Sequence, residues 1–169
     1  MDTHTPEQRS RNMGRIRSVD TTPELRVRRL LHGLGYRFRV HVKALHGRPD
    51  IALTRRRAAV FVHGCYWHGH GCARGRPARS NVDYWSPKIE RNRARDTAAV
   101  AELARQGWRT LVLWECETKN TAELKSRLAA FLGPPRWVSD LTADPHIPGE
   151  VRPDAVKEPS DRTRKPLVR

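Results

Sequence analysis

The strongest constraint on the fold of this chain is a pair of apolar runs, residues 58–63 and 108–114, separated by a helix-length segment. Residues 87–106 between them have helical character, and Gly107 ends that helix. Two strands joined through a helix form a crossover connection, which is right-handed and makes the strands parallel when both lie in one sheet. The pattern therefore predicts an α/β fold with two parallel strands.

Further elements extend this core. A helix is predicted to begin after Thr21, which can cap it, and short strands are predicted at residues 36–40 and 51–53. The 51–53 strand is expected to form a hairpin with residues 58–62. Apolar residues at helical spacing mark the first and last helices: Val27, Leu30, Leu31 and Leu34, then Leu124, Leu128, Phe131 and Leu132. We expect a mixed central sheet flanked by helices.

Charge indicates the class of partner. The chain carries 33 Lys+Arg against 18 Asp+Glu, a formal net charge of +15, and 27 of the basic residues are Arg. Residues 139–169 hold six basic and six acidic residues, so the whole excess lies in residues 1–138. Because the guanidinium group grips phosphate with a planar fork, this excess predicts a nucleic-acid-binding domain. A genome rich in Arg codons would explain the Arg:Lys ratio but not the net charge.

Composition divides the chain into three segments. Residues 1–20 are polar and basic and are predicted to form an arm that orders on DNA, residues 21–138 to form the folded domain, and residues 139–169 to be a disordered tail. The first residues lack the apolar run of a signal peptide, and no stretch is apolar enough to span a membrane. We expect a cytoplasmic, nucleoid-associated protein whose three cysteines are reduced.

Residues 61–72, FVHGCYWHGHGC, concentrate histidines and cysteines. Cys65 follows one predicted parallel strand and Cys116 follows the other, so both should lie at the same edge of the sheet. Cys72 and His70 belong to the same loop and complete a Cys₃His set, which suits a closed tetrahedral Zn²⁺ site. The alternative, three buried cysteines without a metal, fits these loop positions less well. We therefore expect a zinc-stapled loop.

A second group of residues suits acid–base and metal chemistry. A hairpin turn centred at Arg56-Arg57 would bring Asp50 opposite His63. Asp binds hard cations such as Mg²⁺, and His acts as an acid or a base near neutral pH. An Asp that caps a turn and a His that ends a strand would explain the same spacing equally well. A four-coordinate structural zinc has no position for water, so His63 and His68 remain available for catalysis beside Asp50.

Five separated motifs stand in a characteristic order. They are Arg9-Ser10-Arg11-Asn12-Met13; Asp20-Thr21 with Pro23-Glu24; Gly47-Arg48-Pro49-Asp50; Phe61-Val62-His63-Gly64-Cys65-Tyr66-Trp67-His68; and Trp114-Glu115-Cys116. Together they resemble the very short patch repair (Vsr) DNA mismatch endonucleases, over residues 9–135. The resemblance implies a restriction-endonuclease-like core. Phe61-Val62-His63 stands where that fold usually carries Glu-x-Lys.

The resemblance also implies the roles of individual residues. Mg²⁺ would be held by Asp50 and the backbone carbonyl group of Val62. His63 and His68 would be the catalytic histidines, with His68 oriented by Asp96, for which a solvent-exposed helix face is the alternative explanation. The implied zinc ligands are the four already predicted: Cys65, His70, Cys72 and Cys116. Glu24 would be a carboxylate near the metal site, or a residue that merely stabilises a helix N-terminus.

The implied reaction is hydrolysis of one phosphodiester bond on the 5′ side of the thymine in a T·G mismatch, a product of 5-methylcytosine deamination. Such a mismatch can be sensed by side chains wedged between base steps, because unstacking costs least where pairing is weak. Tyr66 and Trp67 are the predicted wedges, with Met13 on the opposite side, although ordinary core packing would also explain these residues. Arg15 and Arg17 of the arm are expected to contact DNA. We expect a monomer.

Two other functions fit part of the pattern. A zinc-stapled module that binds mismatched or distorted DNA without cutting it would keep the cysteines, Trp67 and the charge, but would not need Asp50 near His63. A nuclease of the same fold that cuts paired DNA, as a restriction enzyme does, would share the metal chemistry and differ only in its substrate.

Overall fold

The structure, a computed structural model, describes residues 5, 7, 8, 11, 14, 18–78 and 80–135. One mixed sheet runs in the order β1–β2–β3, with β1 at Ile51–Leu53, β2 at Ala58–His63 and β3 at Arg109–Trp114. β1 is antiparallel to β2, and β2 is parallel to β3. The crossover between the parallel strands is α3 (Val82–Arg105), so the predicted strand–helix–strand unit is confirmed.

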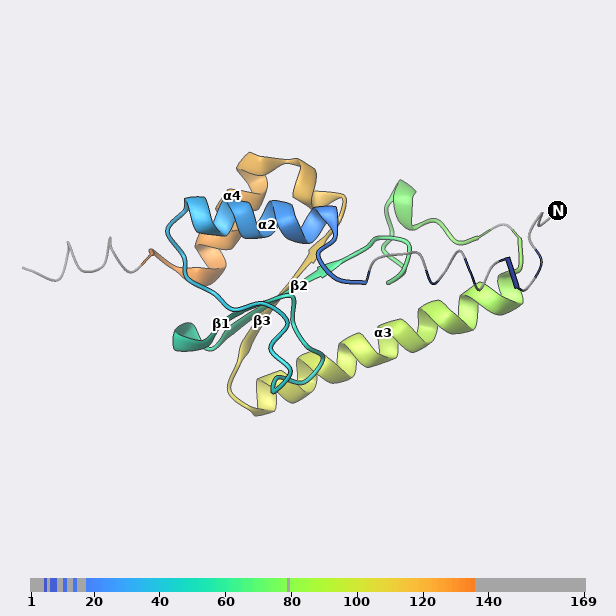
Figure 1. Cartoon of the computed structure of the whole chain (residues 1–169), viewed down its shortest axis with the longest axis horizontal. Helices are drawn as coiled ribbons and strands as arrows, with labels where there is room; N and C mark the ends of the chain where they lie inside the picture. Colours follow the sequence, from blue (N-terminus) through green and yellow to red (C-terminus); the bar gives the residue numbers. More distant parts are fainter. Residues whose placement is uncertain are drawn as a thin grey trace, which may run out of the picture.

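Helices cover both faces of the sheet. α2 (Thr22–Gly33) and α4 (Thr121–Leu132) lie on one face, and α3 lies on the other (Figure 1). Side chains alternate along β2, so Val60 and Val62 pack with α2 and α4, whereas Ala59 and Phe61 pack with α3. The same alternation turns His63 toward α3. The predicted α/β class, a mixed sheet flanked by helices, is therefore confirmed.

The turn between β1 and β2 holds the C-termini of two helices. Arg56 donates from Nη1 to the carbonyl oxygen of Leu132 and from Nη2 to that of Pro134, both at 2.5 Å, at the end of α4. Arg57 donates from Nη2 to the carbonyl oxygen of Gln106 at 2.6 Å, at the end of α3. Carbonyl groups at a helix C-terminus carry partial negative charge, so both guanidinium groups stabilise these ends.

The register of this hairpin differs from the sequence prediction. The turn is centred one residue earlier than expected. In this register Asp50 lies opposite Phe61 rather than His63, so that prediction was wrong. The reason is local: Arg57 takes up the left-handed conformation, with φ 46°, and closes the turn early.

Two other predicted elements are also corrected. Residues 36–40 do not form a strand, and Arg39 makes a single antiparallel bridge to Ala52. Tyr36 is instead buried, and its hydroxyl group donates to the carbonyl oxygen of Gly133 at 2.5 Å. α3 begins at residue 82 rather than 87, with Pro87 inside its second turn.

Two of the predicted segments fall mainly outside the described residues. The tail, residues 139–169, is not described, and the arm, residues 1–20, is described only in part. The division into three segments therefore stays a prediction. None of the described helices is long and apolar enough to cross a membrane.

Candidate active site and metal centre

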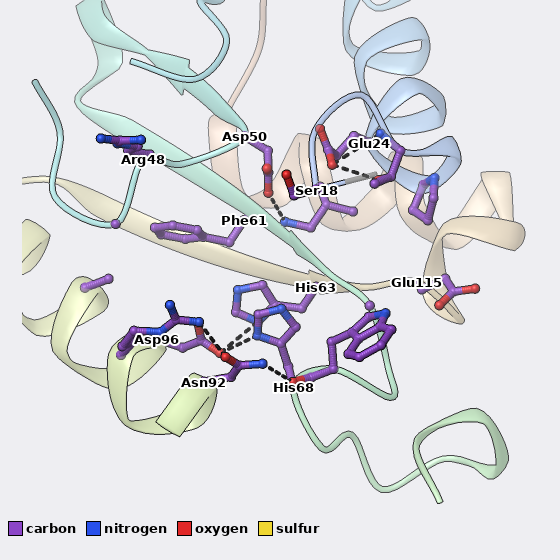
Figure 2. A pocket seen from close by; sticks show the side chains of 18 of the residues that line it. Ser18, Glu24, Arg48, Asp50, Phe61, His63, His68, Asn92, Asp96 and Glu115 are labelled. Atoms are coloured by element: carbon purple, nitrogen blue, oxygen red, sulfur yellow. Dashed lines mark hydrogen bonds and ion pairs between the residues drawn. The ribbon is translucent and has the colours of Figure 1, made fainter. Parts of the chain in front are cut away.

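A cleft of about 910 Å³ opens where the N-terminus of α2, the end of β2 and the middle of α3 meet. Its walls include the four predicted catalytic residues, namely Asp50, His63, His68 and Asp96. Figure 2 shows Asp50 and Glu24 in the upper part of this cleft and the two histidines with Asp96 in the lower part. The cleft therefore has an acidic wall and an imidazole wall.

Asp50 immediately precedes β1 and lies beside β2. The backbone N–H of Val62 donates to its Oδ2 at 2.7 Å. Burial, together with the nearby Glu24 carboxylate, raises the pKa of Asp50 to about 6, although the Val62 hydrogen bond opposes the shift. A carboxylate that is costly to ionise is well placed to gain a cation, so this wall suits a hard divalent metal ion.

The imidazole wall is built from β2, the loop after it, and α3. His68 Nδ1 lies 2.5 Å from Asp96 Oδ2, whereas His63 Nδ1 lies 3.8 Å from the same oxygen. Because an ionised carboxylate only accepts, His68 donates from Nδ1, and its Nε2 is the atom left for other partners. Asp96 thus fixes the orientation and the tautomer of His68.

The two imidazole rings differ in their surroundings. Burial, followed by the charge of nearby His68, lowers the pKa of His63 to about 4, although Asp96 opposes the shift. His63 is therefore neutral at pH 7. A neutral imidazole beside an oriented one is an arrangement that can accept a proton near neutral pH.

An aromatic cluster adjoins His68, and one of its rings, Trp67, lines the cleft. Tyr66, Trp67 and Trp85 contact one another with ring centroids 5.1 to 6.0 Å apart. Lys88 Nζ lies 5.8 Å from the centroid of Trp67 and 5.5 Å from that of Trp85. Aromatic rings beside a cation form a surface on which nucleobases can stack.

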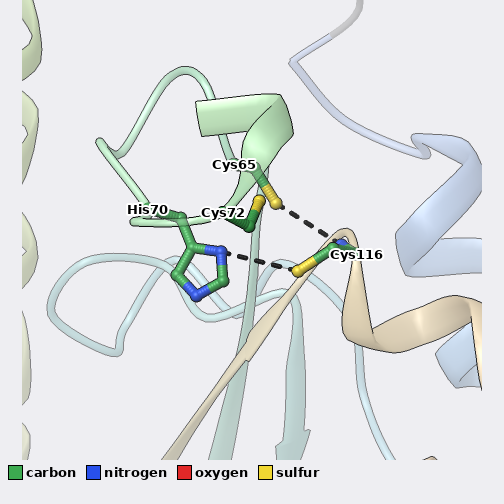
Figure 3. Close-up of side chains that lie close together, drawn as sticks. All are labelled: Cys65, His70, Cys72 and Cys116. Carbon is green, nitrogen blue, oxygen red and sulfur yellow. Dashed lines mark hydrogen bonds between the residues drawn. The ribbon is translucent and has the colours of Figure 1, made fainter. Parts of the chain in front are cut away.

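The four predicted zinc ligands converge at the other end of the loop (Figure 3). One ligand atom from each of Cys65, His70, Cys72 and Cys116 lies within 4.8 Å of the others. Ligands on a tetrahedral zinc would lie roughly 3.5–4 Å apart at the usual bond lengths. The parallel pairing of β2 and β3 brings the two ends together, and Cys116 N–H approaches Cys65 Sγ at 3.4 Å.

The donor set itself fits zinc. Cys65 is fully buried, and this burial raises the pKa of its thiol to about 12. A thiolate would form there only with a compensating positive charge, which a bound Zn²⁺ supplies. His70 Nδ1 lies 3.5 Å from Cys116 Sγ, and the His70 ring stacks on Trp114 with centroids 4.4 Å apart. The loop can therefore hold a tetrahedral ion between two strand ends.

Comparison with known proteins agrees with the resemblance noted in the sequence. Residues 1–74 match the family described as DNA mismatch endonuclease Vsr. The chain is 53% identical to the type II nicking enzyme V.XorIIP of Xanthomonas oryzae pv. oryzae, over 79% of this chain and 98% of that protein. It is 38% identical to the DNA mismatch endonuclease Vsr of Escherichia coli, over 73% of this chain and 79% of that protein. The chain belongs to the Vsr endonuclease family.

One more relative agrees with this, and one solved structure is similar in part. The type II nicking enzyme V.NmeAIP of Neisseria meningitidis is 42% identical over 75% of this chain and 91% of that protein. Among solved structures, the catalytic domain of the homing endonuclease I-Bth0305I superposes with a TM-score of 0.46 and 22% identity, covering 71% of this chain and 97% of that chain. As a member of the Vsr family, the chain is a DNA endonuclease, and its substrate is DNA.

Some site residues of this Vsr-family chain were missed in the sequence. Asn92 on α3 donates from Nδ2 to the carbonyl oxygen of Trp67 at 2.8 Å, which ties the aromatic loop to the helix. Trp85 was missed because the helix was expected to begin after it. Asn92 stands four residues before Asp96, on the same helix face, so helical spacing from Asp96 would have found it. Met13, Arg15 and Arg17 lie outside the described residues, and their DNA contacts stay predictions.

Proposed function

We propose that this Vsr-family endonuclease nicks one strand of duplex DNA on the 5′ side of the thymine in a T·G mismatch, with Mg²⁺ as cofactor. The observation that carries the proposal is the pairing of an acidic wall at Asp50 with the His63, His68 and Asp96 wall in one cleft. A scissile phosphate lying between the two walls would have a cation site on one side and proton-transfer groups on the other.

Asp50 and the carbonyl group of Val62 are the proposed Mg²⁺ ligands. The N–H and C=O groups of one strand residue point to the same side, so Val62 C=O faces Asp50 as Val62 N–H does. In the observed register Pro49 lies opposite Val62, and proline has no N–H to donate to that carbonyl oxygen. A carboxylate and a carbonyl group to which Pro49 cannot donate are oxygen ligands suited to Mg²⁺, which would supply charge neutralisation at the scissile phosphate.

We assign proton transfer to the histidines. His68, held by Asp96 at Nδ1, presents Nε2 to the cleft, and the adjacent His63 is neutral at pH 7. The neutral His63 can accept a proton, whereas His68 can accept one from water or, once protonated, donate one to the leaving oxygen. Asp96 stabilises the imidazolium form of His68 while the proton is carried.

Mismatch recognition is assigned to the aromatic residues. Tyr66 and Trp67, with the neighbouring Trp85, form a ring cluster beside the catalytic wall. Insertion of such rings between base steps unstacks DNA, and it is least costly where pairing is already weak. Asn92, which donates to the backbone carbonyl oxygen of Trp67, would keep the cluster in a fixed position relative to the histidines. Met13, Arg15 and Arg17 are proposed to contact the duplex from the arm.

Zinc is proposed as a structural ion that fixes the loop carrying both His68 and the aromatic rings. The ligands Cys65, His70, Cys72 and Cys116 leave a tetrahedral zinc no position for water, so zinc would take no direct part in hydrolysis. We further propose that the enzyme acts as a monomer in the cytoplasm, on nucleoid DNA.

A nicking assay tests this function. Three labelled duplexes are compared in Mg²⁺: one with a T·G mismatch, the same sequence fully paired, and one with a different mismatch. We expect a single-strand cut beside the mismatched thymine only, lost in Asp50→Ala. Equal cutting of the paired duplex would favour a restriction-type substrate and overturn mismatch specificity.

The binding-only alternative is judged in the same assay. Relatives named as nicking enzymes favour cutting over recruitment. Tight binding of the T·G duplex without any cut, by folded and zinc-loaded protein, would instead assign the chain to the binding module. A reaction without Mg²⁺ is the control for metal dependence: cutting that persists there would point to a contaminating nuclease that needs no added metal.

A further inference from the structure

An ion network that includes Asp20 and Glu24 of the cleft wall is centred on Arg28 of α2. Its Nη1 lies 2.5 Å from Asp20 Oδ1, and its Nη2 lies 2.8 Å from Glu24 Oε2. The same Nη2 lies 2.9 Å from His41 Nε2. One guanidinium group therefore contacts two carboxylates and an imidazole, which come from the start of α2 and from a loop before β1.

The network is not a surface ion pair. The side chain of Glu24 is 3% exposed and that of Arg28 is 12% exposed. Glu24 also accepts hydrogen bonds from Asp20 N–H at 3.0 Å and from the Thr21 hydroxyl at 2.7 Å. The Arg28–Glu24 contact is thus largely shielded from solvent, whereas the side chain of Asp20 is 58% exposed. Charge pairs that are shielded from water act strongly on nearby groups.

Arg28 is held at a cost to folding. Within the part of the chain that the structure describes, its Nε is the one buried side-chain nitrogen or oxygen without a hydrogen-bond partner. An unpaired buried donor is unfavourable, although an apolar residue here would leave the buried Glu24 carboxylate without its counter-charge. The position therefore calls for an explanation beyond packing.

His41 completes the contacts of Arg28. A guanidinium group only donates, so His41 Nε2 is the acceptor in its 2.9 Å contact with Arg28. The same nitrogen lies 3.5 Å from Asp20 Oδ1 and 3.8 Å from Glu24 Oε2. The permanent positive charge inside the network resides on Arg28.

The remaining atoms form a metal-ligand set. One ligand atom from each of Asp20, Glu24 and His41 lies within 4.8 Å of the others. Two carboxylates and a neutral imidazole are suitable ligands for a divalent cation. Arg28 contacts all three, so it occupies the position that such a cation would need.

We infer that Arg28 is a built-in cation that takes the place of a second divalent metal ion on the acidic wall. With Arg28 present, the charge of Glu24 is partly offset, and Asp50 is the carboxylate left to bind the catalytic ion. Arg28 is thus a positioning residue that limits how many metal ions the cleft takes. The statement that Asp50 is left to bind the catalytic ion rests on the proposed Mg²⁺ site. The statement that Arg28 takes the place of a second ion does not.

Binding of Mn²⁺ to the full chain without DNA tests the inference. Mn²⁺ takes the same hard ligands as Mg²⁺ and is counted directly by electron paramagnetic resonance. We compare wild type, Arg28→Met, Arg28→Gln, and Arg29→Met, which removes an exposed arginine of the same helix. Each is also made with Asp50→Ala.

We expect wild type and Arg29→Met to bind about one Mn²⁺ per chain and the two Arg28 variants about two, because three ligands become free. Asp50→Ala should remove one ion from each protein, so Arg28→Met with Asp50→Ala keeps one. That ion should disappear when Glu24→Gln is added. An unchanged count in both Arg28 variants would overturn the inference.

Stability provides a second measurement, since an unpaired Glu24 weakens the fold. Mn²⁺ should raise the Tm of Arg28→Met by more than it raises that of Arg29→Met, because a ligand that binds only the folded state stabilises it. An equal rise would count against the inference. If wild type binds no Mn²⁺, the proposed site at Asp50 is wrong. The inference about Arg28 would then still be tested, because it requires the Arg28 variants to bind one ion more than wild type.

Discussion

The imidazole rings of His63 and His68 stack with centroids 3.9 Å apart and planes 9° apart. Two positive rings would repel one another at this distance, so the pair holds one added proton more readily than two. Asp96 lies closer to His68 than to His63, so this carboxylate stabilises a positive charge on His68 more strongly than one on His63. The two histidines of the stack therefore differ in how readily each carries a positive charge.

Asp96→Asn should lower the single-turnover nicking rate by about 10- to 100-fold, while the affinity for mismatched DNA changes little. An amide cannot stabilise the His68 imidazolium and can also hold the wrong tautomer. The measurement is a quenched nicking time course at saturating enzyme, alongside a binding titration. The matched control is Glu90→Gln, an exposed acid on the same helix, which should cut at the wild-type rate. Equal losses in both variants would remove Asp96 from the catalytic wall.

Cys116→Ser should lower bound zinc and thermal stability together, because a closed structural site needs all four ligands. Zinc is measured by elemental analysis and unfolding by calorimetry. Wild type stripped with a chelator should show the same loss of stability and should recover when zinc is restored. A variant that keeps about one zinc per chain would exclude Cys116 from the ligand set.

Asp50→Asn should make the metal-free protein more stable at pH 7–8 while abolishing nicking. The folded-state pKa of Asp50 is about 6, above its ordinary value of 3.8, so ionisation costs stability as pH rises through this window. The variant avoids that cost, which we put at about 1–2 kcal/mol after allowing for water in the cleft. Chemical denaturation of both proteins between pH 4 and pH 8 measures the difference, which should close toward the acid end.

The same comparison must allow for His63, whose pKa shift acts in the opposite direction. Its folded-state pKa of about 4 lies below the ordinary 6.5, so the unfolded chain binds more protons between these values and stability falls as pH falls. This contribution is common to both proteins, and subtraction removes it. A difference that grows toward acid pH would contradict the role given to Asp50.

Arg56→Gln should destabilise the domain by about 1–3 kcal/mol without weakening DNA binding, because Arg56 is used to hold the carbonyl groups that end α4. Arg55→Gln is the matched control: it lies in the same turn and is exposed, so its stability should change by less than about 0.5 kcal/mol. Urea unfolding and a DNA-binding titration are the two measurements. A loss of affinity in Arg56→Gln at unchanged stability would make this residue part of the DNA interface.

DNA affinity should depend steeply on salt. If about six phosphates are neutralised, log K falls with log[salt] at a slope of about −5. Fluorescence anisotropy between low and moderate salt measures the slope, with paired DNA as a comparison for the part that is independent of the mismatch. A flat response would contradict the interpretation of the net charge of +15 as a DNA-binding surface.

The metal-ligand loop was predictable because topology alone determines it. Cys65 and Cys116 follow two strands whose parallel order is dictated by the helix between them, and the structure brings their side chains together. The strand register that relates Asp50 to His63 was not predictable, because it depends on one backbone angle. Nothing in the sequence indicates that Arg57, rather than a glycine, takes the left-handed conformation that sets the register.

Contacts across irregular segments were also beyond sequence patterns. Arg28 looks like any polar residue of an amphipathic helix, yet its partner His41 stands in a loop 13 positions away with no periodic signal. The arginine-rich turn was similarly ambiguous. Arg56 and Arg57 add to the net charge that indicates nucleic acid, and the structure shows that they bind helix ends.

That turn has a consequence for how the domain opens. Through Arg56 and Arg57 it is bonded to α4 on one face of the sheet and to α3 on the other. A fluctuation that frees the turn releases the ends of both helices at once, so neither layer can fray there independently. In native-state hydrogen exchange, the last turns of α3 and α4 should therefore lose protection together, as one cooperative unit.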